Sequence, residues 1–258
     1  MGEDQLKKVS REEAEEIKEH GAVQDDFQPD AGTMKVDLHC HSESSWDCIT
    51  PLDDIPAQCK KKGIQVQAIT DHNEIWGAQV IKAQVESDPH CDLTIIVGEE
   101  ISTSEGEIIG LFLQEQIESG LTPEETVRQI QAQNGLVLLP HGFDPFKRFR
   151  LQPEARARVA NELDIIETFN ARISRPHWNQ AAVEWAEKRG LLMSAGSDAH
   201  RLVDIGAAWV EVPRRPIRTP QDLLEALEDG VPTGDWTHPV LAFVLKMWGQ
   251  AKNRLGVP

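Results

Sequence analysis

Two histidines separated by one residue, His39 and His41, follow a short apolar segment of the chain. Side chains at positions i and i+2 of an extended segment project to the same face, so the two imidazoles can bind one metal ion. A His-x-His pair alone is a weak signal, because the same spacing occurs in ordinary loops. The other polar residues of the chain decide whether this pair marks a metal site.

Further histidines and carboxylates follow later apolar segments in the same way. They are His72, Glu99, Glu100, His141, Asp198 and His200. Each also has an ordinary interpretation, since Asp71 or Asp198 would suit a helix cap and His141 would merely end a strand. Imidazoles and like charges crowd together only where cations hold them. Independent coincidences at successive segments are less plausible than one shared metal site, which we therefore expect.

The elements that position these side chains are short apolar strands that alternate with helices. Expected strands span residues 34–38, 64–70, 93–98, 107–113, 136–140, 164–169, 191–196 and 207–212. Helix starts are indicated where a capping hydroxyl precedes a proline, at Thr50-Pro51, Thr122-Pro123 and Thr219-Pro220. Helix ends are indicated by Gly63, Gly135, Gly190 and Gly230.

This alternation predicts an α/β fold with a largely parallel sheet, because the strands are mostly apolar along their whole length. Seven or eight such units, closed into a barrel, fit the length of 258 residues. In a parallel barrel the C-terminal ends of the strands converge on one face, where active sites are built. The polar residues above would meet on that face.

The remainder of the chain suggests a single domain with an N-terminal helical arm. Ser10 and Glu13 have the spacing of a capping box, and Gly21 would end that charged helix. We therefore expect a helix and arm over residues 1–33, the main domain over 34–235, and a tail over 236–258.

Composition narrows the classes of partner. The net charge of −17 disfavours stable binding to nucleic acid, which depends on lysine and arginine contacts with phosphate. The four cysteines include no CxxC pair, no apolar run reaches the ~20 residues of a membrane span, and the N-terminus lacks the apolar core of a signal peptide. We expect a reduced, soluble, cytoplasmic protein with no membrane partner, and nothing in the sequence indicates its oligomeric state.

The combined motifs resemble the PHP (polymerase and histidinol phosphatase) family of metal-dependent phosphoesterases. The matching stretches are DLHCHS with the following aspartate (37–47), ITDHN (69–73), VGEEIS (97–102), LPHG (139–142) and SDAH (197–200). As a set and in this order they are specific, although single pieces are not. The resemblance implies a distorted (β/α)7 barrel with two or three divalent metal ions, usually manganese, zinc or iron.

The resemblance also implies which residues bind each ion. By position in the motifs, His39, His41 and Asp198 would bind the first metal ion. Glu100 matches the glutamate that bridges the first and second ions, and His141 would bind the second.

The third ion would be bound by Asp47, His72 and His200. Strand alternation should turn Glu99 away from the site. By the same alternation Cys40 should be a small buried residue of the barrel wall and not a thiolate ligand.

One position departs from the family pattern. Many members have a histidine that binds the second metal ion in a stretch like HILGYF, whereas here the stretch is EIIGLF (107–112) and places Glu107 there. As a ligand, this carboxylate would favour manganese or iron over zinc. The alternative is a surface glutamate beside a weakened or empty second metal position.

The implied reaction is hydrolysis of a phosphoester. Two cations would lower the pKa of a bridging water and supply hydroxide as the nucleophile, and a third would help to bind phosphate or stabilise the leaving oxygen. His200 or Asp47 would pass a proton to that oxygen if it is not fully occupied as a ligand. The expected catalytic residues are Asp198, His200, Asp47 and Arg172.

Phosphate also needs a positive clamp. Arg172 stands just after the sixth expected strand, with Asn170 beside it as a hydrogen-bond donor. Arg148 and Arg150, with Lys147, are second candidates in the loop after His141, although such a charged run is more often a solvated loop.

Several functions agree with these residues. We favour a phosphatase acting on a small phosphomonoester or nucleotide, and the alternative within the class is a phosphodiesterase or exonuclease acting on short nucleic-acid ends. An amidohydrolase also begins with His-x-His on a barrel, but it often uses a bridging carbamylated lysine where this chain has Glu100. A non-catalytic, metal-stabilised PHP module would be expected to have lost more of its ligands.

Overall fold

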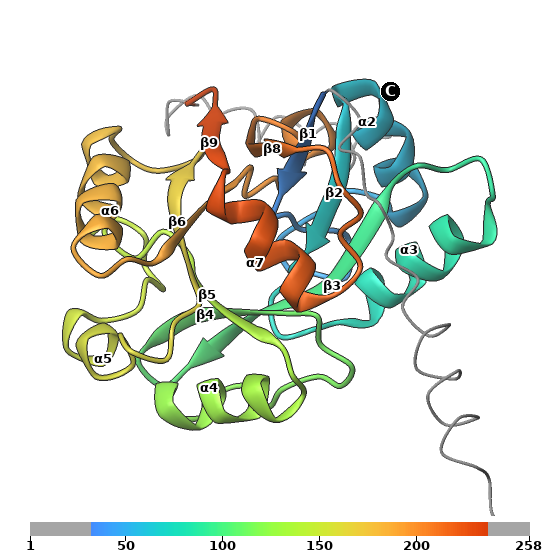
Figure 1. Cartoon of the computed structure of the whole chain (residues 1–258). Coiled ribbons are helices and arrows are strands. Elements are labelled where there is room, and N and C mark those ends of the chain that lie inside the picture. The colour runs from blue at the N-terminus through green and yellow to red at the C-terminus, as the bar shows by residue number, and fades with distance from the viewer. Residues whose placement is uncertain (1–31, 237–258) are drawn as a thin grey trace, which may run out of the picture. The chain divides into compact units, whose positions relative to one another are not determined.

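Nine strands form one sheet in the computed structural model, which describes residues 32–236 (Figure 1). They are β1 (Thr33–Asp37), β2 (Ile64–Ile69), β3 (Thr94–Thr103), β4 (Gly106–Leu111), β5 (Leu136–Leu139), β6 (Ile165–Asn170), β7 (Leu192–Gly196), β8 (Ala208–Pro213) and β9 (Val231–Gly234). The eight expected strands are confirmed, with β3 longer than expected. The sequence did not indicate β9, whose residues VPTG include a proline and follow no apolar pattern. The expected N-terminal helix, the arm up to Ala31 and the tail from residue 237 lie outside the described residues.

Six α-helices pack against the sheet within residues 32–236. They are α2 (Ile55–Lys62), α3 (Trp76–Ser87), α4 (Pro123–Ala132), α5 (Pro153–Arg158), α6 (His177–Glu187) and α7 (Pro220–Glu228). Short 3-10 helices precede α2 (Leu52–Asp54) and β8 (Leu202–Asp204). None of the helices described here is long and apolar enough to cross a membrane.

The sheet order is β7-β6-β5-β4-β3-β2-β1-β8-β9, and the sheet curls into a nearly closed barrel. The gap is bridged at the C-terminal ends of β1 and β7 and in the segments that follow them, where backbone hydrogen bonds join the two parts of the chain. Leu38 N donates to Ala195 O (3.2 Å), Asp198 N to His39 O (2.8 Å) and His41 N to Ala199 O (3.0 Å). The expected distorted barrel is therefore confirmed, and its seam runs through the segments that carry predicted metal ligands.

The expectation of a largely parallel sheet is wrong. Four neighbouring pairs are parallel, namely β1-β2, β2-β3, β5-β6 and β6-β7. The pairs β3-β4, β4-β5, β1-β8 and β8-β9 are antiparallel. The link from β3 to β4 is only Ser104 and Glu105, too short for the crossover that a parallel pair requires. Gly106, with φ 123° and its Cα against the backbone of Arg150, allows this tight turn.

Two of the three predicted helix caps are confirmed. Thr122 forms a capping box with Glu125 at the start of α4, and Thr219 forms one with Asp222 at the start of α7. The cap at Thr50 is wrong, because the next helix is a 3-10 turn without a side-chain cap, and the Thr50 carbonyl accepts a hydrogen bond from Glu43 N. Gly63 ends α2 in the left-handed conformation, with φ 69°. The other three glycines lie just beyond the ends of α4, α6 and α7 (Gly135, Gly190 and Gly230).

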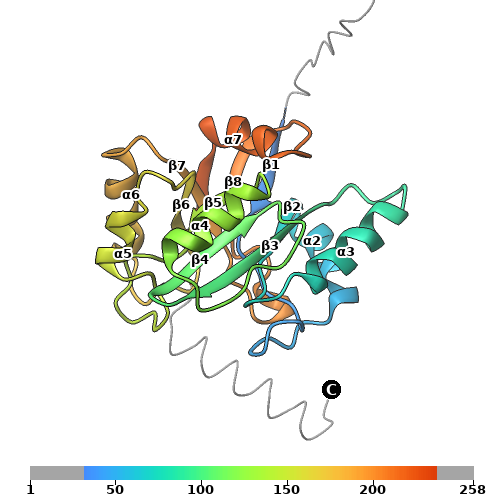
Figure 2. The same cartoon turned by 90° about the horizontal axis from the view of Figure 1, so that it is seen from below.

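Two apolar clusters hold the strands in place. One packs the strands against α2, α3, α4, α5 and α6, with Ile81, Ile130 and Ala186 among its fully buried members. The other joins alternate strand residues such as Val36 and Ile109 to α7. Figures 1 and 2 show α7 apart from the helices around the periphery, as this division requires. Both faces of the sheet are therefore covered, which explains the continuously apolar strands.

Candidate metal centre

The barrel brings the predicted metal ligands together at one end. His39 and His41 follow β1, His72 follows β2, and His141 follows β5. Asp198 and His200 follow β7, Asp47 lies in the loop after β1, and Glu100 and Glu107 lie within the antiparallel pair β3-β4. We expected Glu100 beyond its strand, but the hairpin extends β3 to Thr103 and places Glu100 inside it. An isolated parallel bridge between His72 and Glu100 fixes the two segments side by side.

The first group of ligand atoms surrounds one oxygen of Glu100. The Nε2 atoms of His39 and His41 are 3.2 Å apart, and each is 3.3 Å from Glu100 Oε2. Asp198 Oδ1 is 3.7 Å from His41 Nε2 and 4.0 Å from His39 Nε2. Atoms bound to one cation at about 2.0–2.1 Å are about 3 Å apart at ordinary coordination angles. These imidazole and carboxylate atoms therefore fit a divalent cation.

The second group lies around Glu107 and reaches both oxygens of Glu100. His141 Nε2 lies 2.9 Å from Glu100 Oε1 and 3.8 Å from Glu107 Oε2. His72 Nδ1 lies 3.5 Å from Glu107 Oε1 and 3.3 Å from Glu100 Oε2. Glu100 thus faces both groups, as a bridging carboxylate would. Glu107 is buried and points into the cluster, so the alternative of a surface glutamate is wrong.

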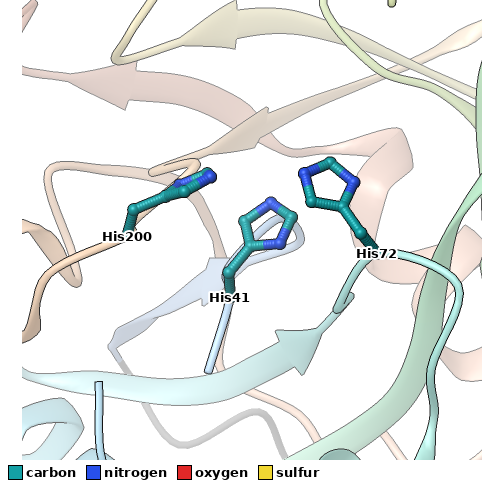
Figure 3. A group of neighbouring side chains, drawn as sticks. All are labelled: His41, His72 and His200. Carbon is teal, nitrogen blue, oxygen red and sulfur yellow. The ribbon is translucent and has the colours of Figure 1, made fainter. Parts of the chain in front are cut away.

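The third group lies on the Asp47 side. Asp47 Oδ2 is 2.9 Å from His200 Nε2, and Asp47 Oδ1 is 3.8 Å from His72 Nε2. Figure 3 shows the ring of His41 between those of His72 and His200, and one nitrogen from each lies within 4.8 Å of the others. The resemblance assigned His41 to the first ion alone, whereas its position suits a ligand of the first or of the third ion.

Two predicted ligands have backbone conformations that are rare for their residue types. The φ angles of His141 and Asp198 are 27° and 49°. Positive φ costs a non-glycine residue on the order of 1–3 kcal/mol, and such strain concentrates at functional sites. Hydrogen bonds hold both residues in place, because His141 N donates to Glu167 Oε2 (2.7 Å) and Asp198 N donates to His39 O (2.8 Å).

Among residues 32–236, lysine and arginine side chains form ion pairs with Asp198 and not with Glu107. Lys147 Nζ forms an ion pair with Asp198 Oδ2, and Arg172 Nη1 lies 3.4 Å from Asp198 Oδ1. Burial alone would raise the pKa of Asp198, but these two cations outweigh it and hold the pKa well below its usual range. On the other side, burial and the neighbouring Glu100 charge raise the pKa of Glu107 to about 10.

The pKa values of the histidines are likewise shifted in opposite directions. Burial would lower the pKa of His39, but the carboxylates of Glu100 and Glu167 outweigh it and raise the pKa well above its usual range. Burial and the neighbouring positive charges of His41 and Arg172 lower the pKa of His200 to about 3. Without bound cations, the cluster therefore keeps protons on some ligands and excludes them from others, a pattern typical of functional sites.

Glu167 of β6 supports the site and was not among the predicted residues. Its Oε1 lies 3.0 Å from His39 Nδ1, which leaves His39 Nε2 directed into the cluster. Its Oε2 accepts hydrogen bonds from His141 N and from Asn170 Nδ2 (3.0 Å). Gly196 makes this contact possible, since a Cβ there would collide with both Glu167 and His39. The available signal was a carboxylate inside the expected strand DIIETF (164–169).

A pocket with a volume of about 160 Å³ opens onto the cluster. Its lining residues are Asp47, His72, Glu100, Glu107, His141, Lys147, Arg148, Phe149, Arg172, Asp198 and His200. Of the predicted substrate-binding residues, Arg172 and Arg148 thus line it and Arg150 does not. Asn170 is buried, and its Oδ1 accepts a hydrogen bond from Arg172 N (2.8 Å), so it positions Arg172.

The two residues expected to point away do so. Glu99 is buried on the other face of β3, where its Oε2 accepts a hydrogen bond from Ile117 N (2.9 Å), and burial raises its pKa to about 7. Cys40 is buried in the barrel wall, paired by backbone with Ala199, and burial raises its pKa well above the usual range. Neither side chain is among the groups able to hold an ion in the described part of the chain.

The family model of the PHP domain matches residues 37–166, and that of the PHP-associated family matches residues 176–232. This chain belongs to the PHP domain family. An uncharacterized protein of Methanocaldococcus jannaschii is 36% identical over 196 residues, which cover 74% of this chain and 75% of the relative. A second uncharacterized protein of that organism is 40% identical over 149 residues, or 54% of this chain and 82% of the relative.

Solved structures share the fold at low sequence identity. A two-domain protein from Bacteroides vulgatus that contains a predicted PHP-like metal-dependent phosphoesterase superposes with a TM-score of 0.61 at 19% identity, covering 79% of this chain and 65% of that one. This chain therefore spans slightly less than two thirds of that protein. PsfC from Pseudomonas syringae has a TM-score of 0.61 at 18% identity, covering 85% and 99% of the two chains. An amidohydrolase from Chromobacterium violaceum has a TM-score of 0.54 at 16% identity, covering 77% and 97%.

Proposed function

We propose that this protein hydrolyses a small phosphomonoester or nucleotide with two or three divalent metal ions. The observation that carries the proposal is the placement of Glu100 between two groups of ligand atoms, with Arg172 and Lys147 in the same pocket. When bound, the ions would supply Lewis-acid activation of water and of the phosphoryl group. The carboxylate of Glu107 favours manganese or iron over zinc. The proposed catalytic domain spans residues 34–235.

Arg172 and Lys147 would bind the phosphoryl oxygens. Both now contact Asp198, and both line the pocket, so a phosphate entering it meets two positive side chains at once. Asn170 holds the Arg172 backbone and Glu167 holds Asn170, so the guanidinium stands on a buried support. This arrangement keeps the clamp fixed as charge shifts between the phosphoryl oxygens and the leaving group.

His200 serves as a ligand in this proposal and not as a proton donor. Its Nε2 contacts Asp47 (2.9 Å), and its Nδ1 contacts Arg172 and lies 2.9 Å from the carbonyl of Asp198. With Nδ1 held by these contacts, Nε2 is the nitrogen that would bind the ion together with Asp47, and it would then carry no proton to donate. Asp47 is less deeply buried than the other ligands, and it is the remaining candidate for passing a proton to the leaving oxygen.

The size and charge of the pocket favour a small substrate. The pocket volume of about 160 Å³ accommodates a phosphoryl group rather than a polynucleotide. The net charge of −17 on the protein also repels a polyanion such as nucleic acid. A bridging carbamylated lysine, as in many amidohydrolases, has no counterpart here, because Glu100 occupies the central position and Lys147 pairs with Asp198.

The test is hydrolysis of a panel of substrates, followed as phosphate release for the monoesters and as release of the alcohol or the amine for the phosphodiester and the amide. Protein stripped of metal and then loaded with manganese, iron(II) or zinc is offered glycerol phosphate, a nucleoside monophosphate, a phosphodiester and an amide, with Asp198→Asn as the control. We expect metal-dependent release from the monoesters that the control lacks. A metal-loaded protein that hydrolyses only the amide, or none of the panel, would overturn the proposal.

A further inference from the structure

Several exposed apolar side chains lie in segments that carry predicted metal ligands. Nine large apolar side chains are exposed among residues 32–236. Seven of them follow predicted ligands in the sequence: Trp46, Ile49, Trp76, Val80, Phe146, Phe149 and Val203. Where such side chains border a pocket, they indicate a surface that contacts a ligand.

One of these aromatic residues lines the pocket, and a second stacks on a residue that lines it. Phe149 lines it, with 44% of the side chain exposed. The ring of Trp46 stacks on that of His72, a lining residue, with centroids 5.9 Å apart and planes inclined by 30°. Trp46 nevertheless remains 74% exposed, so most of its surface is available to a ligand.

Both aromatic residues belong to the Glu107 side of the pocket. His72 Nδ1 lies 3.5 Å from Glu107 Oε1, and Glu107 N donates a hydrogen bond to Phe149 O (2.7 Å). The two cations that contact Asp198, Lys147 and Arg172, line the same pocket, and the guanidinium of Arg148 lies 5.1 Å from the ring centroid of Phe149. The pocket therefore combines cations suited to phosphate with neighbouring aromatic rings that the proposed chemistry does not use.

The volume of the pocket indicates where the remainder of a substrate would lie. Pockets that enclose a drug-sized ligand have volumes of about 300–1,000 Å³, whereas this one has about 160 Å³. A phosphoryl group bound inside must leave the rest of its ester at the mouth, beside Trp46 and Phe149. Tryptophan and phenylalanine faces stack on planar rings with little dependence on ring identity.

We propose that Trp46 and Phe149 form a subsite for a planar aromatic group carried by the leaving oxygen of the substrate. The inference rests on the proposed function, because it assigns the leaving-group side of that phosphomonoester site. An aryl phosphate and a nucleoside monophosphate share this chemistry, and the two are separated by the test.

The chain offers matched controls for both residues. Trp76 is also an exposed tryptophan and Phe146 an exposed phenylalanine of the same loop as Phe149, but neither lines the pocket. Trp46→Ala and Phe149→Ala are therefore compared with Trp76→Ala and Phe146→Ala, and Trp46→Phe serves as the conservative variant. The substrates are p-nitrophenyl phosphate, adenosine monophosphate and glycerol phosphate.

We expect kcat/KM for the aromatic substrates to fall about tenfold in Trp46→Ala and less in Phe149→Ala, as for loss of one stacking contact. Glycerol phosphate turnover should stay within about twofold, and Trp46→Phe should retain most of the preference. A loss confined to adenosine monophosphate would identify a nucleotide subsite, and a loss for both substrates a general aryl subsite. The subsite would be overturned if Trp46→Ala lowered kcat/KM for glycerol phosphate as much as for the aromatic substrates. It would also be overturned if Trp76→Ala and Phe146→Ala had the same effect as Trp46→Ala and Phe149→Ala.

A binding measurement separates this inference from the proposed function. Phenylphosphonate and methylphosphonate are not hydrolysed, and their Kd values for the metal-loaded protein are compared by calorimetry. We expect wild type to prefer phenylphosphonate and Trp46→Ala to lose that preference, whatever the turnover. Glycerol phosphate hydrolysis without a phenyl preference would overturn the subsite and leave the proposed function standing.

Discussion

Two buried carboxylates of the same cluster, Asp198 and Glu107, have opposite surroundings. Asp198 contacts Lys147 and Arg172, and its pKa is held well below the usual range. Glu107 has only histidines in ion-pair contact within residues 32–236, and burial beside Glu100 raises its pKa to about 10. The protein therefore pairs Asp198 directly with its own cations, whereas at Glu107 the nearby Lys147 charge lowers the pKa less than burial and Glu100 raise it.

This difference shows where bound cations matter most. A buried carboxylate without a partner is unfavourable, because its charge loses the solvation of water. At Asp198, Lys147 and Arg172 offset the lost solvation of the buried carboxylate. In the proposed reaction, the phosphate of the substrate would compete with Asp198 for these two residues. On the Glu107 side a divalent cation is the remaining compensation, so loading with metal should stabilise that side more.

The largest expected effect is that of Asp198→Asn. The change removes a predicted ligand and also leaves Lys147 and Arg172 without their carboxylate. We expect kcat/KM for a phosphomonoester to fall on the order of 100-fold or more, and the melting temperature of the metal-free protein to fall as well. Steady-state phosphate release and thermal unfolding measure the two effects. Unchanged activity would exclude Asp198 from the site.

Glu107→Gln should have the opposite effect on the metal-free protein. Amide replaces a carboxyl that is costly to ionise, so the melting temperature without metal should rise, while metal content and activity should fall. The folded-state pKa of about 10 lies above the unfolded value of 4.5, so ionisation in the unfolded state destabilises the wild type increasingly above pH 4.5. The difference in melting temperature between metal-free Glu107→Gln and the metal-free wild type should therefore grow from pH 5 to pH 9. A variant less stable than wild type throughout that range would contradict the comparison.

Glu167→Gln tests the support that the two sides share. Its carboxylate orients His39 and holds the backbone of His141. We expect metal affinity to weaken by about 10- to 100-fold, as for loss of a partner behind a metal ligand. Titration of metal-free protein with manganese measures this affinity. An unchanged Kd would mean that β6 positions neither histidine.

The smallest effect is expected far from the cluster, at the start of α4. Thr122→Ala removes a capping box with Glu125 and should cost about 1 kcal/mol of unfolding free energy. Metal content and activity should not change, which makes this variant the reference for plain destabilisation. If Thr122→Ala lowered metal content as much as Glu107→Gln, the metal loss in the latter would reflect general instability.

Local patterns in the sequence were sufficient for much of the fold. Apolar runs located eight strands, and Thr122 and Thr219 cap helices as their Thr-Pro pairs indicated. The strand directions could not be read, because an apolar run has the same appearance in a parallel or an antiparallel pair. The two-residue link before Gly106 was the available clue to the hairpin.

The site shows the same limit. The sequence motifs predicted that His39, His41 and Asp198 bind one metal ion, and the structure places the three side chains together. Glu167 was missed because its importance depends on contacts with residues 26 and 128 positions away, made possible by Gly196. The burial of Glu107 was likewise undecided in the sequence, since it results from the loop around Phe149 that covers β4.

The most direct test of this account is anomalous diffraction at the manganese edge from crystals of manganese-loaded protein. The account predicts strong peaks inside the cluster, one of them between Glu100 and Glu107 within reach of His141 and His72. The Glu107→Gln crystal should lose or weaken that peak and keep the one beside His39 and Asp198. Peaks confined to the molecular surface, or no peak within the cluster, would contradict the metal centre on which the proposed function depends.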